Sequence, residues 1–409
     1  MRKWATWLLL AVFSCPAMAS KSLSIEEFEQ FLAKLQNKSD ARVAQELADV
    51  ELTEHVSLER LANWEKNYPG AQSHEALIRL ADSAAFLKPP ASDLPRISPP
   101  DSDTQERMLA LASEYVKSTV ARLPDFSALR ETTHFEDTPS QETLMPMASS
   151  ASKWHTHPLG IPIGRNEEKP LRCTGTSSMT VTYRGGKELV DTTMTKREKE
   201  DQPQADMTTS GEFGPILSVV IGDAMRGQVA WSHWEQSSGD PMAVMQYAVP
   251  QDDSNFAVAI PNGAKTDLIY PAYHGEIAID PATGSILHLS VVGDMTGLYQ
   301  SMQANMLVEY APVAIGARTC MCPVHGVALS RVPVPGAAPD ERSGTISMRT
   351  QLNDVEFTHY HQFGSEARIL ANDVGQAPSG GSAGAIPDGA PTPSASQPPA
   401  TSPAPDHPR

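Results

Sequence analysis

Two histidine pairs have the spacing of candidate metal ligands. His155 and His157 are two residues apart, as are His359 and His361. In a β-strand, side chains at this spacing project from the same face, where two imidazoles can share a metal ion. Neither motif contains a third ligand, and packed or surface histidines explain both. We therefore expect no metal and no cofactor.

A cysteine pair offers a second kind of chemistry. Cys320 and Cys322 are followed by His325, and an imidazole beside a thiol is a common way to activate sulfur as a nucleophile. The alternative is structural: two cysteines flanking one strand residue would be strained as a mutual disulfide, whereas Cys173 can reach one of them across a sheet. We favour buried thiols or a disulfide between Cys173 and Cys322, and a thiol-dependent enzyme around Cys322 remains an alternative.

Other catalytic signatures are weak or missing. The order Asp280-Pro281-Ala282-Thr283-Gly284 superficially resembles an aspartic-protease triplet, but a proline-initiated turn explains it fully. The only Gly-x-Ser-x-Gly string, Gly380-Gly381-Ser382-Ala383-Gly384, lies in the Pro/Ser/Ala-rich tail, where no strand-turn-helix elbow is expected, and the sequence contains no His-Glu-x-x-His and no phosphate-binding glycine loop. Three common routes to hydrolysis or nucleotide chemistry therefore lack their local residues or the elements that would position them. No catalytic residue is assigned.

A group of apolar side chains provides the best candidate binding site. It consists of Val229, Trp231, Trp234, Tyr247 and Phe256. If the strands that carry them belong to a curled sheet, these side chains line a concave apolar surface. An ordinary contact between the sheet and a helix predicted over residues 108–123 explains the same pattern.

The elements that position these residues follow from periodicity. A capping box of Ser24 and Glu27 starts a helix, apolar residues recur at helical spacing near residues 58–64 and 73–84, and the rhythm over 108–123 is the most regular. Beyond Phe126 the period changes to two, which is typical of strands. The glycines of Arg184-Gly185-Gly186-Lys187 predict a hairpin turn between strands at 179–183 and 188–192, and a short helix fits residues 214–225. Short turns separate the strands predicted at 229–236, 243–249, 255–260, 273–279, 285–292, 306–315, 318–322, 324–331 and 344–363, so an antiparallel meander is expected.

The N-terminus resembles a secretory signal. Arg2 and Lys3 precede an apolar run over residues 4–13, and Ala17-Met18-Ala19 is a small-x-small cleavage site. The run is shorter than the roughly 20 residues that a transmembrane helix needs, so no membrane span is expected after cleavage. In an alternative reading, Val12-Phe13-Ser14-Cys15 partly resembles a lipobox, with Cys15 becoming a lipidated N-terminus. Either reading predicts a periplasmic or secreted protein.

Composition narrows the partners further. The formal charge is −17 at pH 7, and removing Arg2 and Lys3 with the signal peptide takes it from −17 to −19, which argues against nucleic acid and anionic membranes. We expect a signal peptide (1–19), a helical domain (20–87), a Pro-rich linker (88–103), a domain of one helix and an antiparallel sheet (104–373), and a disordered Pro/Ser/Ala-rich tail (374–409).

Several segments resemble an uncharacterised family of exported proteins from Acidobacteria. The resemblance implies no activity and no catalytic residue. It covers nearly all of residues 23–370 and is carried by Lys38-Ser39-Asp40-Ala41, Glu51-Leu52-Thr53-Glu54, Arg60-Leu61-Ala62, Trp64-Glu65, residues 77–86, Leu123-Pro124-Asp125-Phe126, residues 132–139, Phe213-Gly214-Pro215-Ile216-Leu217, Trp231-Ser232-His233-Trp234-Glu235, residues 273–284 and Val308-Glu309-Tyr310.

A remoter similarity is to the open β half-barrels of periplasmic lipoprotein carriers (LolA-like) and of the sigma-E regulatory sensor RseB. It rests on strand order and on the run from Tyr273 to Gly284 followed by Val308 and Tyr310. The expected fold is therefore α+β: an N-terminal helical domain followed by a curved, half-barrel-like antiparallel sheet packed on a long helix.

The expected function is non-catalytic. We expect a binding or carrier protein that holds an apolar ligand, a lipid or a lipidated protein, on the curled sheet. The alternative is an envelope module that binds another protein.

Overall fold

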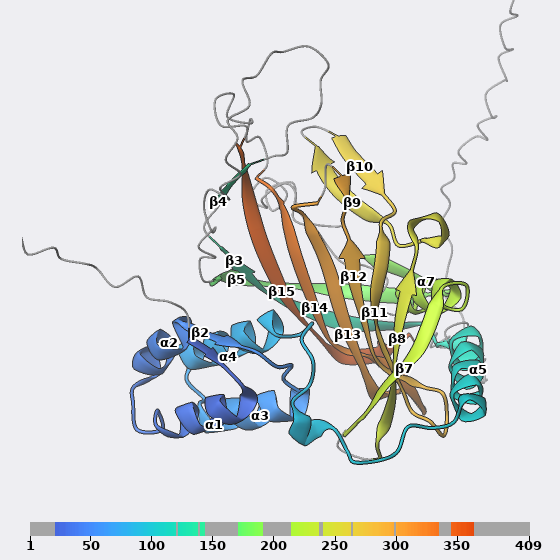
Figure 1. Ribbon diagram of the computed structural model, residues 1–409, viewed down its shortest axis with the longest axis horizontal. Helices are drawn as coiled ribbons and strands as arrows, with labels where there is room; N and C mark the ends of the chain where they lie inside the picture. The colour runs from blue at the N-terminus through green and yellow to red at the C-terminus, as the bar shows by residue number, and fades with distance from the viewer. Residues whose placement is uncertain are drawn as a thin grey trace, which may run out of the picture. The chain divides into compact units, whose positions relative to one another are not determined.

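The described part of the chain combines helices with a large antiparallel sheet (Figure 1). The computed structural model describes residues 21–119, 122–137, 140–143, 171–190, 214–236, 240–262, 265–297, 300–334 and 345–363. The predicted signal segment, the predicted tail and the pair His155 and His157 lie outside these residues.

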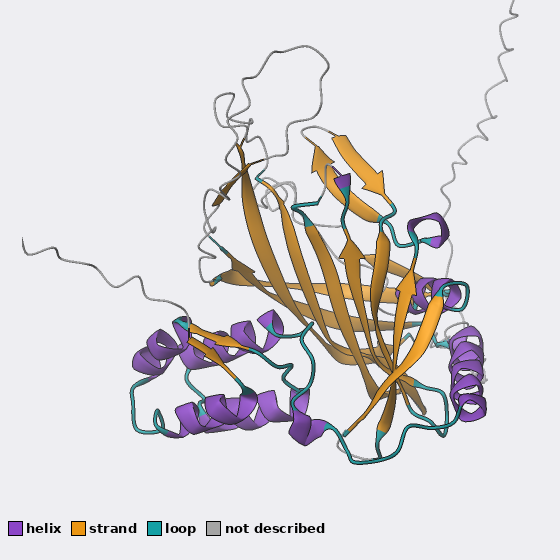
Figure 2. Ribbon diagram, in the orientation of Figure 1, coloured by secondary structure: helices purple, strands orange, loops and turns teal. Residues whose placement is uncertain are grey.

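Helices form the first part of the described chain and two further segments (Figure 2). The predicted capping box is confirmed, because Ser24 and Glu27 bond reciprocally through their side chains and backbone N–H groups. The rings of Phe28 and Trp64, 4.9 Å apart, belong to one hydrophobic cluster within residues 23–84. The helices are α1 (Ile25–Ala33), α2 (Asp40–Ala48), α3 (Leu58–Asn67), α4 (Ala71–Ser83), α5 (Ser102–Thr119) and α7 (Pro215–Ala224), with 3-10 turns η1 (Ala91–Asp93) and η3 (Gln251–Asp253).

Most strands belong to one antiparallel sheet. The strands are β1 (Lys21–Leu23), β2 (Val50–Leu52), β3 (Phe126–Glu136), β4 (Ser140–Thr143), β5 (Arg172–Arg184), β6 (Lys187–Val190), β7 (Gln228–Glu235), β8 (Met242–Val249), β9 (Val258–Asn262), β10 (Lys265–Ile269), β11 (Ala272–Ile279), β12 (Ile286–Asp294), β13 (Gln303–Ile315), β14 (Arg318–Pro333) and β15 (Thr345–Gln362). Two small sheets are separate: a parallel pair of β1 and β2, and an antiparallel pair of β9 and β10.

In the part of the chain that the structure describes, the large sheet is not closed into a barrel. Its strand order is β6-β5-β3-β15-β14-β13-β12-β11-β8-β7, with β4 beside β15. The run from β11 to β15 is the predicted meander, but β3 inserts beside β15, a pairing that local turns do not indicate. In the view of Figure 1, β3 and β5 run across behind β13, β14 and β15. Within the described residues, β6 and β7 are therefore the two free edges.

Two predicted hairpins are confirmed. Gly185 and Gly186, both with positive φ (57° and 76°), form the turn between β5 and β6. The turn between β11 and β12 is closed by a bond from Gly284 N–H to the Asp280 carbonyl oxygen (2.8 Å). Thr283 donates its hydroxyl to the Asp280 carboxylate (2.6 Å). Asp280 and Thr283 therefore form a turn, as predicted, rather than part of an aspartic-protease triplet.

One predicted boundary was wrong. The sequence suggested two strands on either side of Pro323, whereas β14 runs without interruption from Arg318 to Pro333. Proline lacks the N–H that a ladder needs, and the register with β13 shifts where Pro323 lies opposite Tyr310. The strand therefore continues through the proline because an irregularity accommodates the missing donor.

The sheet presents two chemically different faces. Ile277, Leu289 and Val308 are aligned across β11, β12 and β13, and all three belong to a hydrophobic cluster. Because side chains alternate between faces, the next row lies on the opposite side. That row is mostly charged or polar and consists of His288, Glu309, His325 and Glu356. One face is thus an apolar core, and the other carries titratable groups.

Candidate functional site

The five residues predicted to bind a ligand lie in one hydrophobic cluster. Tyr247 on β8 is buried, while Val229, Trp231 and Trp234 on β7 and Phe256 before β9 are partly buried against the same cluster. The indole rings of Trp231 and Trp234 are 5.0 Å apart in an edge-to-face arrangement. Three residues apart in a regular strand, they would face opposite sides, but the register shifts between Trp231 and His233. This irregularity brings both indoles to the apolar face.

Side chains from two helices complete the same cluster. Met108, Ala112 and Val116 come from α5, and the residues from α7 are Ile216, Leu217, Val220, Ile221 and Ala224. The apolar surface that the sequence predicted is thus occupied by the chain's own helices. Tyr247 is buried beneath these helices, whereas Val229, Trp231, Trp234 and Phe256 are only partly covered.

Helix α7 is short and strongly apolar. It begins after Gly214 with Pro215 at its first turn, and six of its ten residues are buried. An isolated helix of this length is unstable in water, so packing must hold it. Asp223 is the only charged residue of the helix.

Asp223 ties α7 to the sheet. Its carboxylate is 1% exposed and accepts hydrogen bonds from the Tyr273 hydroxyl (2.8 Å), the Asn255 N–H (2.7 Å), the Asn255 side-chain amide (2.7 Å) and Arg226 (2.6 Å). Burial and the bond to Asp223 raise the pKa of Tyr273. A buried carboxylate is tolerated when such donors surround it. Helix α7, β11 and the segment before β9 are therefore joined through the Asp223 carboxylate.

The sequence analysis did not identify the hydrogen bonds of Asp223, although the sequence contains a signal for them. A lone aspartate inside the apolar run of α7 must either reach water or find donors. The strand predicted from Asn255 instead begins at Val258, and both donor groups of Asn255 point to Asp223. The rings of Phe256 and Tyr247 lie 5.3 Å and 5.8 Å from that of Tyr273. Asp223 and Tyr273 are therefore neighbours of the predicted aromatic site.

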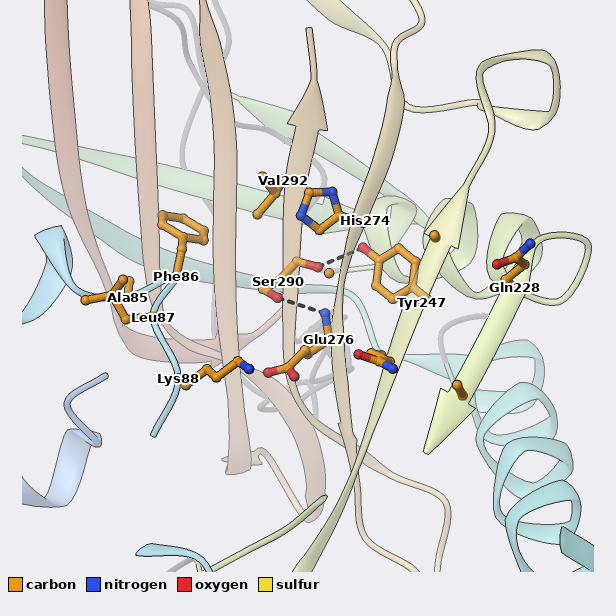
Figure 3. Close-up of a pocket in the computed structure, with 14 residues that line it drawn as sticks. Ala85, Phe86, Leu87, Lys88, Gln228, Tyr247, His274, Glu276, Ser290 and Val292 are labelled. Atoms are coloured by element: carbon orange, nitrogen blue, oxygen red, sulfur yellow. Dashed lines mark hydrogen bonds between the residues drawn. The ribbon is translucent and has the colours of Figure 1, made fainter. Parts of the chain in front are cut away.

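A hollow of about 400 Å³ lies elsewhere, between residues 85–88 and strands β7, β8, β11 and β12 (Figure 3). Its lining mixes apolar side chains such as Phe86 with polar ones such as Lys88 and Glu276, which point toward each other in Figure 3. Tyr247 is the one predicted residue in its lining, and its hydroxyl donates to the Ser290 carbonyl oxygen (2.7 Å). The hollow is near the lower limit of volume for small-molecule sites.

The three cysteines that the structure describes do not form an activated thiol site. Cys173, Cys320 and Cys322 are all free, so the candidate disulfide between Cys173 and Cys322 is not formed in this structure. Cys322 packs in a cluster with Phe126, whereas Cys173 packs against the cluster that contains Phe135. Burial raises the pKa of Cys322 to about 12, the opposite of what a nucleophilic cysteine requires.

The histidine pair on β15 remains at the surface. His359 and His361 are exposed, and the register with β3 shifts between Thr358 and His361. Among the described residues, neither histidine belongs to a group of three side chains close enough to share a metal ion. His325, which the sequence suggested as a partner for Cys322, instead bonds to Glu309 and Asp354.

Comparisons with known proteins add no assignment. In the described residues, no helix has both the length and the apolar character of a membrane-spanning segment. No protein-family model, curated protein or solved structure matches the chain.

Proposed function

We propose that this chain is an exported, non-catalytic binding or carrier protein. Its ligand would be apolar, a lipid acyl chain or the acyl group of a lipidated protein, held between the apolar face of the large sheet and α7. Trp231, Trp234 and Tyr247, together with Val229 and Phe256, would contact it.

One observation supports this proposal most directly: α7 fills the aromatic cluster while a single buried carboxylate ties it to the sheet. A ten-residue helix contributes little stability of its own, so α7 can leave as a unit when a ligand replaces its apolar side chains. The helix would then act as an exchangeable occupant of the site.

The open sheet is compatible with such a movement. Within the described residues β6 and β7 have no partner on their outer sides, and α7 is followed almost directly by β7. We propose that the sheet is a curved half-barrel of the LolA-like kind, packed on α5, with residues 20–87 as a separate helical domain. The strand order and the shared cluster with Met108, Ala112 and Val116 support this architecture.

Export is the second part of the proposal. Arg2, Lys3, the apolar run over residues 4–13 and the site Ala17-Met18-Ala19 form a signal peptide pattern. We propose cleavage before Ser20 and a periplasmic or secreted location. N-terminal sequencing of the protein recovered from an extracytoplasmic fraction tests this, and a mature chain that begins at Met1 would contradict it.

Tryptophan fluorescence can test the ligand site directly. Bromine atoms quench indoles at short range, so 9,10-dibromostearate should quench the full-length mature protein, whereas stearate should not. The double variant Trp231→Phe/Trp234→Phe should lose most of this quenching. It should still bind stearate. Trp64 provides the internal reference, because it packs in the separate cluster around Phe28.

Two results would contradict the proposal. One is the absence of both quenching and copurifying lipid in native mass spectrometry. The other is quenching that persists unchanged in the double variant, which would place the ligand elsewhere.

A second candidate is an envelope module that binds another protein. Leu268 on β10 and Tyr270 after it are 57% and 46% exposed, and exposed large apolar side chains that lie close together mark interaction sites. Cross-linking in cells through a photoreactive residue at position 268 separates the candidates, because a scaffold yields one defined protein neighbour and a carrier yields lipid.

A further inference from the structure

A buried group of acidic side chains surrounds His325 on the other face of the sheet. The imidazole Nδ1 lies 2.7 Å from Glu309 Oε2, and its Nε2 lies 2.8 Å from Asp354 Oδ1 and 3.8 Å from Asp82 Oδ1. Asp82, His325 and Asp354 are all buried, with at most 8% of each residue exposed. One ligand atom from each of these three residues lies within 4.8 Å of the other two.

Strand register and helix packing bring these residues together. Glu309 and His325 are direct partners on β13 and β14, and Asp354 comes from the adjacent strand β15. Asp82 is on α4, far away in sequence. Two residues that flank it, Ile78 and Ala85, pack in one cluster with Val327 and Leu352 of the sheet. This contact holds the end of α4 over His325.

Asp82 supplies an independent indication of a missing ligand. Its Oδ2 atom is buried and has no hydrogen-bond partner within the described part of the chain, although the residue is only 2% exposed. Leaving a buried carboxylate oxygen unpaired costs several kcal/mol, roughly, unless a proton or a cation compensates it.

We infer that Asp82, His325 and Asp354 bind a divalent first-row transition metal ion, Zn²⁺ or Mn²⁺, with Glu309 as the residue that orients the imidazole. A mixed set of one imidazole and two carboxylates suits these ions, whereas Cu⁺ prefers sulfur ligands. In the metal-bound form the Nδ1–H of His325 would donate to Glu309, as is common for metal-bound histidines. The Nε2 atom, which bonds to Asp354 Oδ1 (2.8 Å) in this structure, would release its proton and bind the metal through its lone pair. The unpaired Oδ2 of Asp82 completes a bidentate carboxylate or accepts a bond from a metal-bound water.

The position of this site defines its role. Its ligands are buried, as in structural metal sites, and they join α4 to β14 and β15. The ion would therefore fasten the helices of residues 21–83 to the polar face of the sheet. This role does not depend on the proposed apolar ligand, which lies on the opposite face.

Metal analysis of the mature protein tests this inference. The protein is stripped with EDTA, incubated with ZnCl₂ or MnCl₂, passed through a desalting column and measured for bound metal and for thermal unfolding. We expect one tightly bound ion per chain and a higher Tm with metal. Asp82→Asn should abolish both effects, and Glu309→Gln should weaken the affinity by about 10- to 100-fold, as is typical of outer-shell partners.

Asp82→Asn also controls for misfolding. Asparagine keeps the shape of the side chain and cannot place a charge at this buried position, so the metal-free variant should unfold at the same temperature as metal-free wild type or higher. His274→Asn is the matched control, because His274 forms a half-exposed pair with Asp294 (3.0 Å) outside the cluster. A variant with His155 and His157 replaced by asparagine tests the other histidine motif, and both controls should keep the bound ion.

Three outcomes would overturn the inference. The first is wild-type protein without stoichiometric metal. The second is a metal content and Tm response in Asp82→Asn equal to those of wild type. The third is loss of the ion in either control variant but not in Asp82→Asn.

Discussion

Replacing Asp223 with asparagine should loosen α7 without unfolding the protein. The asparagine side chain has nearly the same shape, but it removes the negative charge that four donors share. If Asn255 turns its amide over, the neutral side chain can still bond to Asn255 and Tyr273. The main loss is therefore the charge assistance of the buried bonds and the pairing with Arg226.

The magnitude follows from these contacts. Charge-assisted bonds are about twice as strong as neutral ones, so each of the three buried bonds from Asn255 and Tyr273 loses about 1 kcal/mol. Arg226 contributes little because its side chain is 54% exposed. Relief from burying a charge offsets part of the loss. The net weakening is about 2 kcal/mol, which raises the population with α7 detached by a factor of about 30.

Two measurements check this estimate. Hydrogen exchange of the backbone amides in residues 215–224 should accelerate by up to about 30-fold, while exchange in β13 and β14 stays unchanged. If the ligand binds only when α7 has left, the apparent affinity for dibromostearate should rise by a similar factor. Asp252→Asn is the control, because Asp252 is exposed on η3.

The two readouts separate the possible failures. Unchanged exchange in 215–224 would refute the argument that Asp223 holds α7. Faster exchange with unchanged affinity would support the argument that Asp223 holds α7. It would contradict the proposal that the ligand binds at this site.

Other predictions concern thiol chemistry and backbone packing. Burial raises the pKa of Cys322 from about 9 to about 12, so between these pH values the unfolded chain releases a proton that the folded chain retains, and stability should fall as pH rises above 9. Urea titrations at pH 8 and 11 should show a smaller decrease for Cys322→Ala than for wild type, and an equal decrease would contradict the assignment. At pH 8, iodoacetamide should modify Cys322 only after unfolding; rapid modification of the folded protein would instead favour the thiol enzyme. Gly275→Ala should lower the free energy of unfolding by about 1–3 kcal/mol or more. A Cβ at this position would lie 2.0 Å from the Ser290 carbonyl oxygen and 2.9 Å from the Tyr247 hydroxyl. A stability in urea equal to that of wild type would show that the strand shifts freely.

Local patterns predicted local structure well. The capping box at Ser24 and the turns at 185–186 and 280–284 each rest on side-chain or backbone preferences within a few residues, and each is present. The helix at α2 was not predicted, because its nine residues contain only two buried positions, Val43 and Leu47. Too few apolar residues recur there to define a period.

Long-range features were beyond the sequence. The pairing of β3 with β15 joins residues such as Glu136 and Gln351, which are 215 positions apart, and no turn signal encodes it. The tie at Asp223 and the cluster around His325 depend on such distant contacts as well. The sequence predicted that Val229, Trp231, Trp234, Tyr247 and Phe256 lie together, and they do share one cluster; their binding of a ligand stays a prediction. The helix α7 in that cluster was predicted only as a short segment with no assigned place.

The position of β15 has a consequence for how the sheet can assemble. It is the last strand in the described chain, yet it lies between β14 and β3 and so connects two groups of strands. Both groups of strands can therefore form before residues 345–362 are available. Only β15 can then pair with β3 on one side and β14 on the other and join the groups into one sheet. Contacts this distant in sequence close slowly. The nascent chain should consequently remain open until synthesis is nearly complete, and a truncation before residue 345 should yield two disconnected sheet fragments rather than a smaller version of the fold.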